Sequence, residues 1–417
     1  MTLTQLLAHP YMKRLLIARF ISNFGNGISP VALAFGILHL KNGSATLLGW
    51  VLGSITIAMV LMSPFGGVIA DKYGRARMVG LCDTWGAIGL FVQVGFFATG
   101  NVPLWVLLAA NINFGIMWGI WWPAFSGIMP AILPETALQK GNSVNSFISN
   151  IAYIVGAATA GFLVSAYGST IALGIDAATF LIAGLLVLSF SHIIPKADKT
   201  ENTMLADLKQ GWGVFISLRW FVAVVFGFSF IVMCWAAAEN VLGPLIALKH
   251  FNGPKSWAFV LTAESIGFVV GSLIGMRVNF KYPMRTLLIL TSTVALYIWS
   301  LATPQSLVLI AICAFGWGIV LDLWGTIWST TMQRLIPREV LSRVSSFDAM
   351  GTMLLRPVGL ALAAPLAGLI GITRTLESAA VFSLVVLVVI LAVPEVRNLS
   401  FRDLPAVPDP SSMPQVE

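Results

Sequence analysis

The chain has 417 residues, of which 58% are hydrophobic and 10% are charged, and its mean hydropathy is +0.89. A soluble domain of this length needs far more charge to cover its surface. The formal net charge of +7 could indicate an acidic partner. The placement of the basic residues along the chain explains it better.

Apolar runs long enough to cross about 30 Å of hydrocarbon recur along the whole chain. They are continuous and do not alternate with polar residues, which favours helices over a membrane barrel. The first six predicted spans are 11–39, 44–70, 78–99, 103–132, 143–166 and 170–194. The second six are 220–248, 256–279, 284–302, 306–333, 343–366 and 373–393. We therefore predict an all-α membrane protein with twelve transmembrane helices.

Spans four to six repeat as spans ten to twelve when the chain is shifted against itself by 203 positions. The shift places Gly115 on Gly318, Trp121 on Trp324, Pro134 on Pro337, Gly156 on Gly359 and Gly168 on Gly371. The repeat predicts two pseudo-symmetric halves of six helices, residues 1–194 and 219–394. Between them, residues 195–218 are a polar cytoplasmic linker with an amphipathic helix, and residues 395–417 are a disordered cytoplasmic tail.

Lysine and arginine concentrate on one side of this arrangement. With the N-terminus in the cytoplasm, 18 of the 24 basic residues fall on the inner side and 4 on the outer side. This asymmetry is the positive-inside pattern and places both termini in the cytoplasm. The excess of lysine and arginine is then explained by the orientation of the chain in the membrane, which argues against a nucleic-acid partner. The expected location is the cytoplasmic (inner) membrane, spanned many times.

The loop between spans two and three carries a spaced motif. Gly67, Asp71, Lys72, Gly74, Arg75 and Arg77 follow the pattern Gly, three residues, Asp, basic, any residue, Gly, then basic residues. Gly67 allows close helix approach and Gly74 a tight turn. The motif resembles the signature of the major facilitator superfamily, in which this loop fastens the two halves in one state of the transport cycle. The alternative is a charged turn that only obeys topology.

The remainder of the chain resembles the bacterial macrolide-efflux and enterobactin-exporter branch of the drug:proton antiporters. Residues 317–371 support this, especially the run from Ile336 to Ser346. Two features depart from the pattern of antiporters. Span five reads Gly156-Ala157-Ala158-Thr159-Ala160-Gly161 without a proline, and span four has Asn111 and Asn113 where an arginine is common.

Charged side chains inside the spans need a reason, because each costs about 2.5–3.5 kcal/mol at mid-bilayer on insertion scales. The candidates for proton coupling are Glu239, Glu264, Asp322 and Arg356. Burial disfavours a charged carboxylate, whereas a nearby arginine or cationic substrate favours it, so a proton and a substrate could compete for one charge. A static ion pair that locks helices together is the alternative. Asp83, Asp348 and Arg343 are predicted to extend the inner gate network.

The resemblance implies that spans one, four, seven and ten line the substrate cavity. In this chain they offer Asn23, Asn26, Asn113, Trp118, Trp121, Trp122, Trp235, Asn240, Trp317, Trp324 and Trp328. Aromatic walls with few polar groups suit bulky amphipathic ligands. An interfacial aromatic belt explains some of these tryptophans equally well.

The sequence contains no nucleotide-binding, metal-ligand or hydrolase motif, so we expect no cofactor, no metal and no enzymatic activity. We interpret the chain as a monomeric secondary transporter that exports small amphipathic molecules, such as a drug, a siderophore or a metabolite, in exchange for protons. A proton-coupled importer or facilitator, and a receptor or scaffold that transports nothing, remain open alternatives. Membrane lipid is the other expected partner.

Overall fold

The structure is a computed structural model that describes residues 10–100, 102–133, 135–191, 212–275, 277–278, 280–336 and 338–400. Helices account for nearly all of these residues, and no strand occurs among them. The predicted linker helix lies largely outside the described residues, although residues 212–217 are helical. Of the predicted tail, residues 401–417 lie outside them as well.

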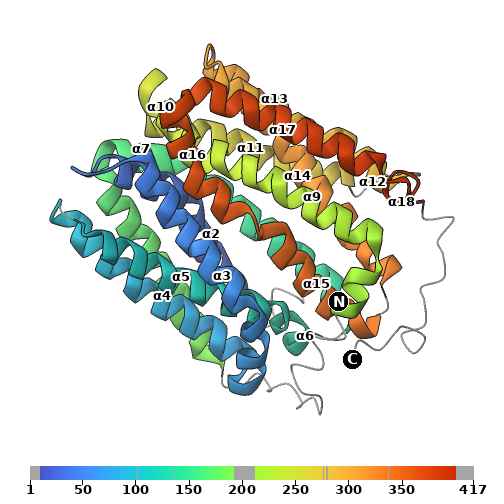
Figure 1. Cartoon of the computed structure of the whole chain (residues 1–417). Helices are drawn as coiled ribbons and strands as arrows, with labels where there is room; N and C mark the ends of the chain where they lie inside the picture. The colour runs from blue at the N-terminus through green and yellow to red at the C-terminus, as the bar shows by residue number, and fades with distance from the viewer. Residues whose placement is uncertain are drawn as a thin grey trace.

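The helices form two bundles, coloured blue to green and yellow-green to red in Figure 1. The first bundle comprises α2 (Pro10–Leu38), α3 (Ala45–Tyr73), α4 (Arg75–Ala98), α5 (Leu104–Ser126), α6 (Ile128–Ile132) and α7 (Glu135–Ser191). The second begins with α9 (Arg219–Ala236), the π-helix η1 (Ala237–Leu242), α10 (Gly243–His250), α11 (Pro254–Gly275), α12 (Pro283–Thr291) and α13 (Thr293–Ala302). It continues with α14 (Leu307–Leu335), α15 (Arg338–Met353), α16 (Arg356–Ile370), α17 (Ile372–Ala392) and α18 (Pro394–Arg397).

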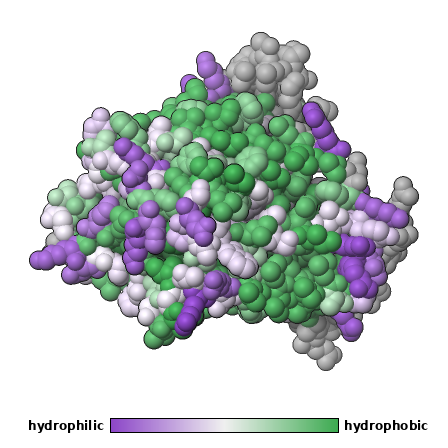
Figure 2. Space-filling model, turned by 90° about the horizontal axis from the view of Figure 1, so that it is seen from above, coloured by the Kyte–Doolittle hydropathy of each residue, from purple (hydrophilic) through white to green (hydrophobic). Residues whose placement is uncertain are grey.

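Eleven helical stretches in the described part of the chain are long and apolar enough to cross a membrane. One of them, Gly141–Ser191, has 51 residues, about twice the length that a single crossing needs. Within it, Gly168 has a φ of 83°, which interrupts the helix between the predicted fifth and sixth spans. The surface suits lipid: large apolar side chains point outward on many helices, up to 81% exposed at Leu369. Figure 2 shows these hydrophobic areas between separate groups of hydrophilic residues.

Several predicted spans are interrupted. The seventh changes from α-helix to π-helix at Ala237–Leu242, a wide turn that often accompanies function. The eleventh breaks between α15 and α16, just before Pro357, which has no backbone N–H to donate. At this break the N–H of Leu355 instead donates to Ser229 Oγ at 3.1 Å. The break makes Arg356 the first residue of α16, in the middle of the span.

Glycines allow two helix pairs to cross closely, one in each bundle. A Cβ on Gly115 would collide with the carbonyl oxygen of Ile55 where α5 crosses α3, and one on Gly318 would collide with that of Glu264 where α14 crosses α11. Gly115 and Gly318 are partners in the 203-residue repeat, so the two crossings correspond. Gly74, with a φ of 98°, makes the predicted turn between α3 and α4. The close approach expected at Gly67 belongs to its neighbour Gly66, which faces the backbone of Gly119.

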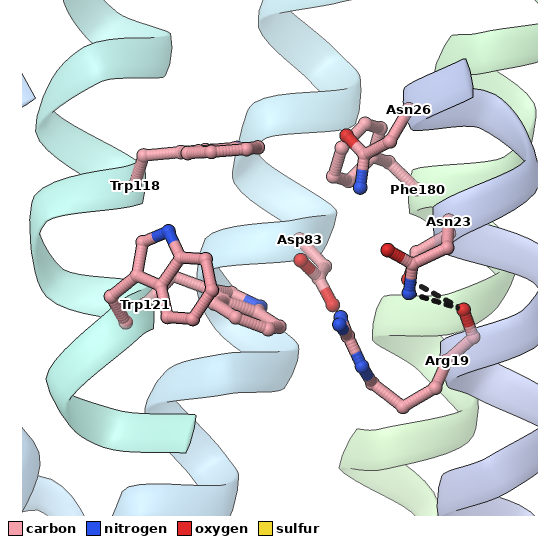
Figure 3. Close-up of a pocket in the computed structure, with 9 residues that line it drawn as sticks. Arg19, Asn23, Asn26, Asp83, Trp118, Trp121 and Phe180 are labelled. Atoms are coloured by element: carbon pink, nitrogen blue, oxygen red, sulfur yellow. Dashed lines mark hydrogen bonds between the residues drawn. The ribbon is translucent and has the colours of Figure 1, made fainter. Parts of the chain in front are cut away.

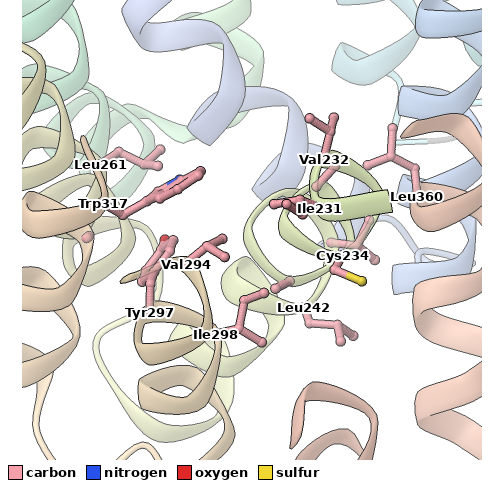
Figure 4. Close-up of a cluster of buried hydrophobic side chains, with 14 of the residues drawn as sticks. Ile231, Val232, Cys234, Leu242, Leu261, Val294, Tyr297, Ile298, Trp317 and Leu360 are labelled. Carbon is pink, nitrogen blue, oxygen red and sulfur yellow. The ribbon is translucent and has the colours of Figure 1, made fainter. Parts of the chain in front are cut away.

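The second bundle has a continuous apolar core. Figure 4 shows the side chains of Trp317, Tyr297, Val294 and Leu261 packed together where α14, α13 and α11 meet. Trp317 is 1% exposed and Tyr297 is fully buried. A polar cluster described below borders this core.

The two bundles meet chiefly through α3 with α16 and through α7 with α11. The contacts include Gly49 near the start of α3, which faces the carbonyl oxygen of Leu360, and Gly161 of α7, which faces the first residues of α11. Both lie toward the end of the molecule where α3 begins, and α10 also contacts α2 there. Among the described residues, α5 and α14 make no comparable contact across the bundles. We call the end where α3 begins the closed end.

Replacing Gly49 with alanine should weaken the closed end, because the added Cβ would overlap a backbone oxygen of α16. Overpacking of this kind costs about 1–3 kcal/mol, so the ratio of closed to open molecules should fall about 5- to 150-fold. Spin labels on Lys41→Cys and Lys249→Cys, one in each bundle, would report the separation of this end after the three native cysteines are replaced. The expected result is a larger population at long distance. Gly53→Ala is the matched control, because its Cβ would have only an ordinary contact at 3.6 Å; equal distance distributions for the two variants would refute the expectation.

Candidate functional site

A pocket of about 90 Å³ lies inside the first bundle, among α2, α4, α5 and α7. Its lining combines polar groups with aromatic rings: Arg19, Ser22, Asn23, Asn26, Asp83, Trp118, Trp121, Trp122 and Phe180. Five of these residues were predicted to line the substrate cavity. The structure therefore brings Asn23, Asn26 and the three tryptophans of span four to one place.

Arg19 and Asp83 form the charged centre of this pocket. Figure 3 shows the guanidinium group of Arg19 pointing toward the carboxyl group of Asp83, and the two charges interact. The guanidinium carbon also lies 4.7 Å from the ring centre of Trp121 and 4.5 Å from that of Phe125. Asn23 donates to the carbonyl oxygen of Arg19 at 2.7 Å. Asp83, predicted as part of the inner gate, thus lines the pocket and faces Arg19.

Glu239 and Glu264 meet in the second bundle. Glu239 lies in η1 and is 7% exposed, Glu264 lies in α11 and is 4% exposed, and their carboxyl groups interact. Trp235 Nε1 donates to Glu239 Oε2 at 2.8 Å. Arg356 interacts electrostatically with Glu239. The structure therefore brings together three of the four predicted proton-coupling candidates.

This acidic cluster adjoins the contact between the bundles. Tyr153 of α7, in the first bundle, interacts with the charges of both glutamates. The π-helix that carries Glu239 packs against α2 and α3, and α11 packs against α7. Tyr297 of α13, in the second bundle, also interacts with Glu239. Sequence reasoning did not find the two tyrosines, because an apolar span containing one tyrosine has no distinguishing pattern.

A different part of the second bundle holds Asp322 and Asp348. Asp322 accepts a hydrogen bond from Ser272 Oγ at 2.9 Å and lines an open pocket of about 470 Å³. Asp348 accepts from Trp328 Nε1 at 3.0 Å and lines a pocket of about 300 Å³ between α9, α14 and α15. Leu321 and Gly325 line both pockets, so the two carboxylates lie in neighbouring pockets.

The other predicted cavity residues take separate places. Asn113 accepts from Trp85 Nε1 at 2.8 Å in a groove between α4 and α5, away from Asn23. Trp317 is in the apolar core against Trp235, and Asn240 lies in η1 beside Glu239. Trp324 and Trp328 form part of an aromatic stack on α14.

The gate residues are only partly described. Arg75 lies against Gly127, the residue that follows α5, where the negative end of the helix dipole favours a cation. Lys72 covers the ring of its neighbour Tyr73 with its Nζ 5.4 Å from the ring centre. Arg77 is exposed. The side chains of Asp71 and Arg343 lie outside the described residues.

These features define a class of protein. Long lipid-facing helices, two bundles that meet at one end, and charged pockets within the membrane-spanning length are what a multi-pass membrane transport protein needs. The chain matches the model of the Major Facilitator Superfamily over residues 15–360 and belongs to that family.

Among curated proteins, the chain is 24% identical to macrolide efflux protein A of Streptococcus pyogenes over 92% of this chain and 95% of that protein. It is 26% identical to the multidrug efflux pump Tap of Mycolicibacterium fortuitum, over 94% and 97% of the two chains. It is 25% identical to the enterobactin exporter EntS of Citrobacter koseri, over 98% and 97%.

Solved structures show the same fold. The nucleoside transporter NupG superposes with a TM-score of 0.70 at 16% identity, covering 92% of this chain and 98% of NupG. A bacterial homologue of the iron transporter ferroportin, in its inward-facing state, gives a TM-score of 0.72 at 14% identity, covering 94% and 99%. The match to the family model confirms the predicted family.

The pairing of Arg19 with Asp83 can be tested by a double-mutant cycle. Asp83→Leu and Arg19→Met should each destabilise the protein by about 3–5 kcal/mol, because each leaves a buried charge without its partner. The double variant should cost less than the sum of the two by about 1–3 kcal/mol. The free energy of unfolding of the purified protein in mixed micelles, titrated with dodecyl sulfate, measures all three. Strict additivity would show that the two charges do not stabilise one another, and Glu395→Gln is the control for loss of an exposed acid.

Proposed function

We propose that the protein is a proton-coupled exporter of small amphipathic molecules that works by alternating access in the cytoplasmic membrane. It acts as a monomer, because one chain supplies both bundles. Twelve spans fit the interruption of the 51-residue stretch at Gly168, which divides that stretch into two crossings. The asymmetry of lysine and arginine supports cytoplasmic termini. With that orientation, the closed end of the molecule faces outward and the structure is open toward the cytoplasm.

The observation that carries the proposal is the pair Glu239 and Glu264 at the contact between the bundles. Two carboxylates that share a site in a low dielectric do not both ionise readily, and Arg356 offers a single positive charge nearby. The pair therefore binds a proton most favourably when it is enclosed. When the closed end opens, water reaches the pair and removes that constraint.

This location links protonation to the conformational change. Enclosing an uncompensated carboxylate between the bundles costs several kcal/mol, whereas enclosing a protonated one costs far less. A proton taken up from the outer side would allow the closed end to form around Tyr153 of the first bundle and the two glutamates of the second. Release of that proton toward the cytoplasm would allow the closed end to open again. Proton movement inward would drive substrate movement outward.

Efflux is the direction that the relatives support. Macrolide efflux protein A, the multidrug efflux pump Tap and EntS are all named as exporters, and each aligns with more than nine-tenths of this chain. Their named substrates differ, so they support amphipathic small molecules as a class. The aromatic pockets of both bundles suit such molecules.

The proposal predicts that neutralising the glutamate pair uncouples transport from the proton gradient. Cells expressing the chain should accumulate less of at least one amphipathic dye than control cells, and a protonophore should abolish the difference. Glu239→Gln and Glu264→Gln should remove the protonophore-sensitive part while the protein remains folded and present in the membrane. Asp322→Asn tests the remaining acid, and Glu395→Gln, which changes an exposed acid in α18, is the matched control.

A pH-jump measurement on proteoliposomes sharpens the test. Proteoliposomes that contain the wild-type protein should take up dye faster with a gradient of about one pH unit than without it. Such a gradient supplies about 1.4 kcal/mol per proton. Uptake by Glu239→Gln should be the same in both conditions. Gradient-stimulated transport in both glutamine variants would refute coupling at this pair. Dye binding without any flux would indicate a receptor, and uptake into intact cells would indicate an importer.

A further inference from the structure

A stack of aromatic rings lines the pocket between α9, α14 and α15. The ring of Phe228 stacks on Trp324 with centres 4.4 Å apart, and Trp324 stacks on Trp328 with centres 6.0 Å apart. The ring of Phe221 also stacks on Trp328, with centres 5.1 Å apart. We call this set the aromatic stack. Three of its rings, those of Phe228, Trp324 and Trp328, line the pocket of about 300 Å³ that Asp348 also lines.

The first bundle contains a corresponding arrangement. The 203-residue repeat places Trp121 on Trp324 and Phe125 on Trp328, and the rings of Trp121 and Phe125 stack at 4.7 Å. In that bundle the stack holds a cation of the protein itself, since the guanidinium group of Arg19 lies over both rings. The carboxyl group of Asp83 faces this cation, as described above.

The equivalent of Arg19 in the second bundle follows from the glycine contacts. A Cβ on Gly156 would collide with the carbonyl oxygen of Phe24, and one on its repeat partner Gly359 would collide with that of Met233. Phe24 and Met233 are 209 positions apart, and the same shift takes Arg19 to Phe228. The second bundle therefore has a phenyl ring where the first has a guanidinium group. In the part of the chain that the structure describes, no lysine or arginine lines the pocket beside this stack.

Acidic groups border the second pocket. Asp348 lines it, whereas its repeat partner in the first bundle is the neutral Asn145. Asp322 lines the adjoining pocket, which shares Leu321 and Gly325 with the first. Among the described residues, no lysine or arginine lines either pocket. The pocket is also about three times as large as the one that contains Arg19, at 300 Å³ against 90 Å³.

We propose that the pocket between α9, α14 and α15 binds the cationic group of an amphipathic substrate. This group supplies the positive charge that Arg19 supplies in the first bundle. The positive charge lies between Asp348 and Asp322, and the apolar body packs against the edges of the aromatic stack. The two carboxylates attract a desolvated cation, and the aromatic rings offer apolar surface to the rest of the molecule. The substrate class is then a hydrophobic cation with a bulky apolar body. This inference rests on the proposed function only in treating the open region as the substrate's path.

Two ions of the same shape and opposite charge test the charge preference directly. Tetraphenylphosphonium is a hydrophobic cation and tetraphenylborate is its anionic counterpart. Binding of each to the purified full-length protein in lipid nanodiscs can be followed by calorimetry and by quenching of tryptophan fluorescence. We expect tetraphenylphosphonium to bind at least about tenfold more tightly than tetraphenylborate. Equal affinity, or tighter binding of the anion, would overturn the proposal.

Variants locate the site. Asp348→Asn and Asp322→Asn should each weaken tetraphenylphosphonium binding about tenfold and reduce the preference over tetraphenylborate. Glu395→Gln and Glu377→Gln, which remove acids far along the chain from both pockets, should leave binding unchanged. Near-wild-type melting temperatures exclude misfolding as the cause, and Phe228→Leu, which retains an apolar side chain, tests the stack without changing charge. Unchanged affinity in both aspartate variants would refute the site.

The experiment separates this inference from the proposed function. Binding is measured without any proton gradient, so it does not depend on coupling at Glu239 and Glu264. Protonophore-sensitive export of neutral or anionic dyes, together with no preference for tetraphenylphosphonium, would overturn the cation site and leave the exporter standing. Selective cation binding that requires Asp348, without flux in proteoliposomes, would support the site and overturn the exporter.

Discussion

Most of this chain lies in apolar helices long enough to cross a membrane, and a charged side chain buried among them needs a partner, a proton or a ligand. This constraint governs the arrangement of both bundles. Arg19 has Asp83 and two aromatic rings. Glu239 has Arg356, the indole of Trp235 and a second carboxyl group with which it shares a site. Within the part of the chain that the structure describes, Asp322 accepts a hydrogen bond from Ser272, and Asp348 accepts from Trp328 and Thr352. Carboxylates that face no arginine or lysine among the described residues are, in our proposal, the ones that bind a proton or a cationic substrate.

The same reasoning explains why two bundles of one ancestral pattern differ where they do. The glycine contacts of α3 with α5 and of α11 with α14 correspond, because close helix crossing tolerates no side chain at those positions. Positions facing the pockets do not carry that steric restriction. There the repeat has diverged to Arg19 and Phe228, and to Asn145 and Asp348. The close helix crossings are therefore the same in the two bundles, whereas the residues that line the pockets differ between them.

Much of the architecture could be predicted from the sequence, because it depends on local and periodic signals. Continuous apolar runs predicted the helices, and Gly74 predicted the turn between α3 and α4. Other features depend on which helices become neighbours. Asp83 was assigned to the gate because it lies close in sequence to Arg75 and Arg77, but the packing of α4 against α5 and α7 turns it toward Arg19. Asn113 was placed in the cavity because of its span, yet its position around the helix directs it to Trp85. The π-helix at Glu239 adds a residue to one turn, which no apolar periodicity reveals.

The separation of the two acidic sites bears on how a proton could drive a substrate. The sequence allowed the hypothesis that a proton and a substrate compete for one carboxylate. In the structure, Glu264 and the serine that binds Asp322 lie on the same helix, α11, eight residues or about 12 Å apart. A proton and a substrate then need not compete for one charge. The two sites are connected through α11 and α14, which pack closely against each other at glycines. A proton at the closed end and a cation in the open pocket would act on the same two helices from opposite ends. Each would favour a different position of that pair relative to the first bundle, which is the differential interaction that coupled transport requires.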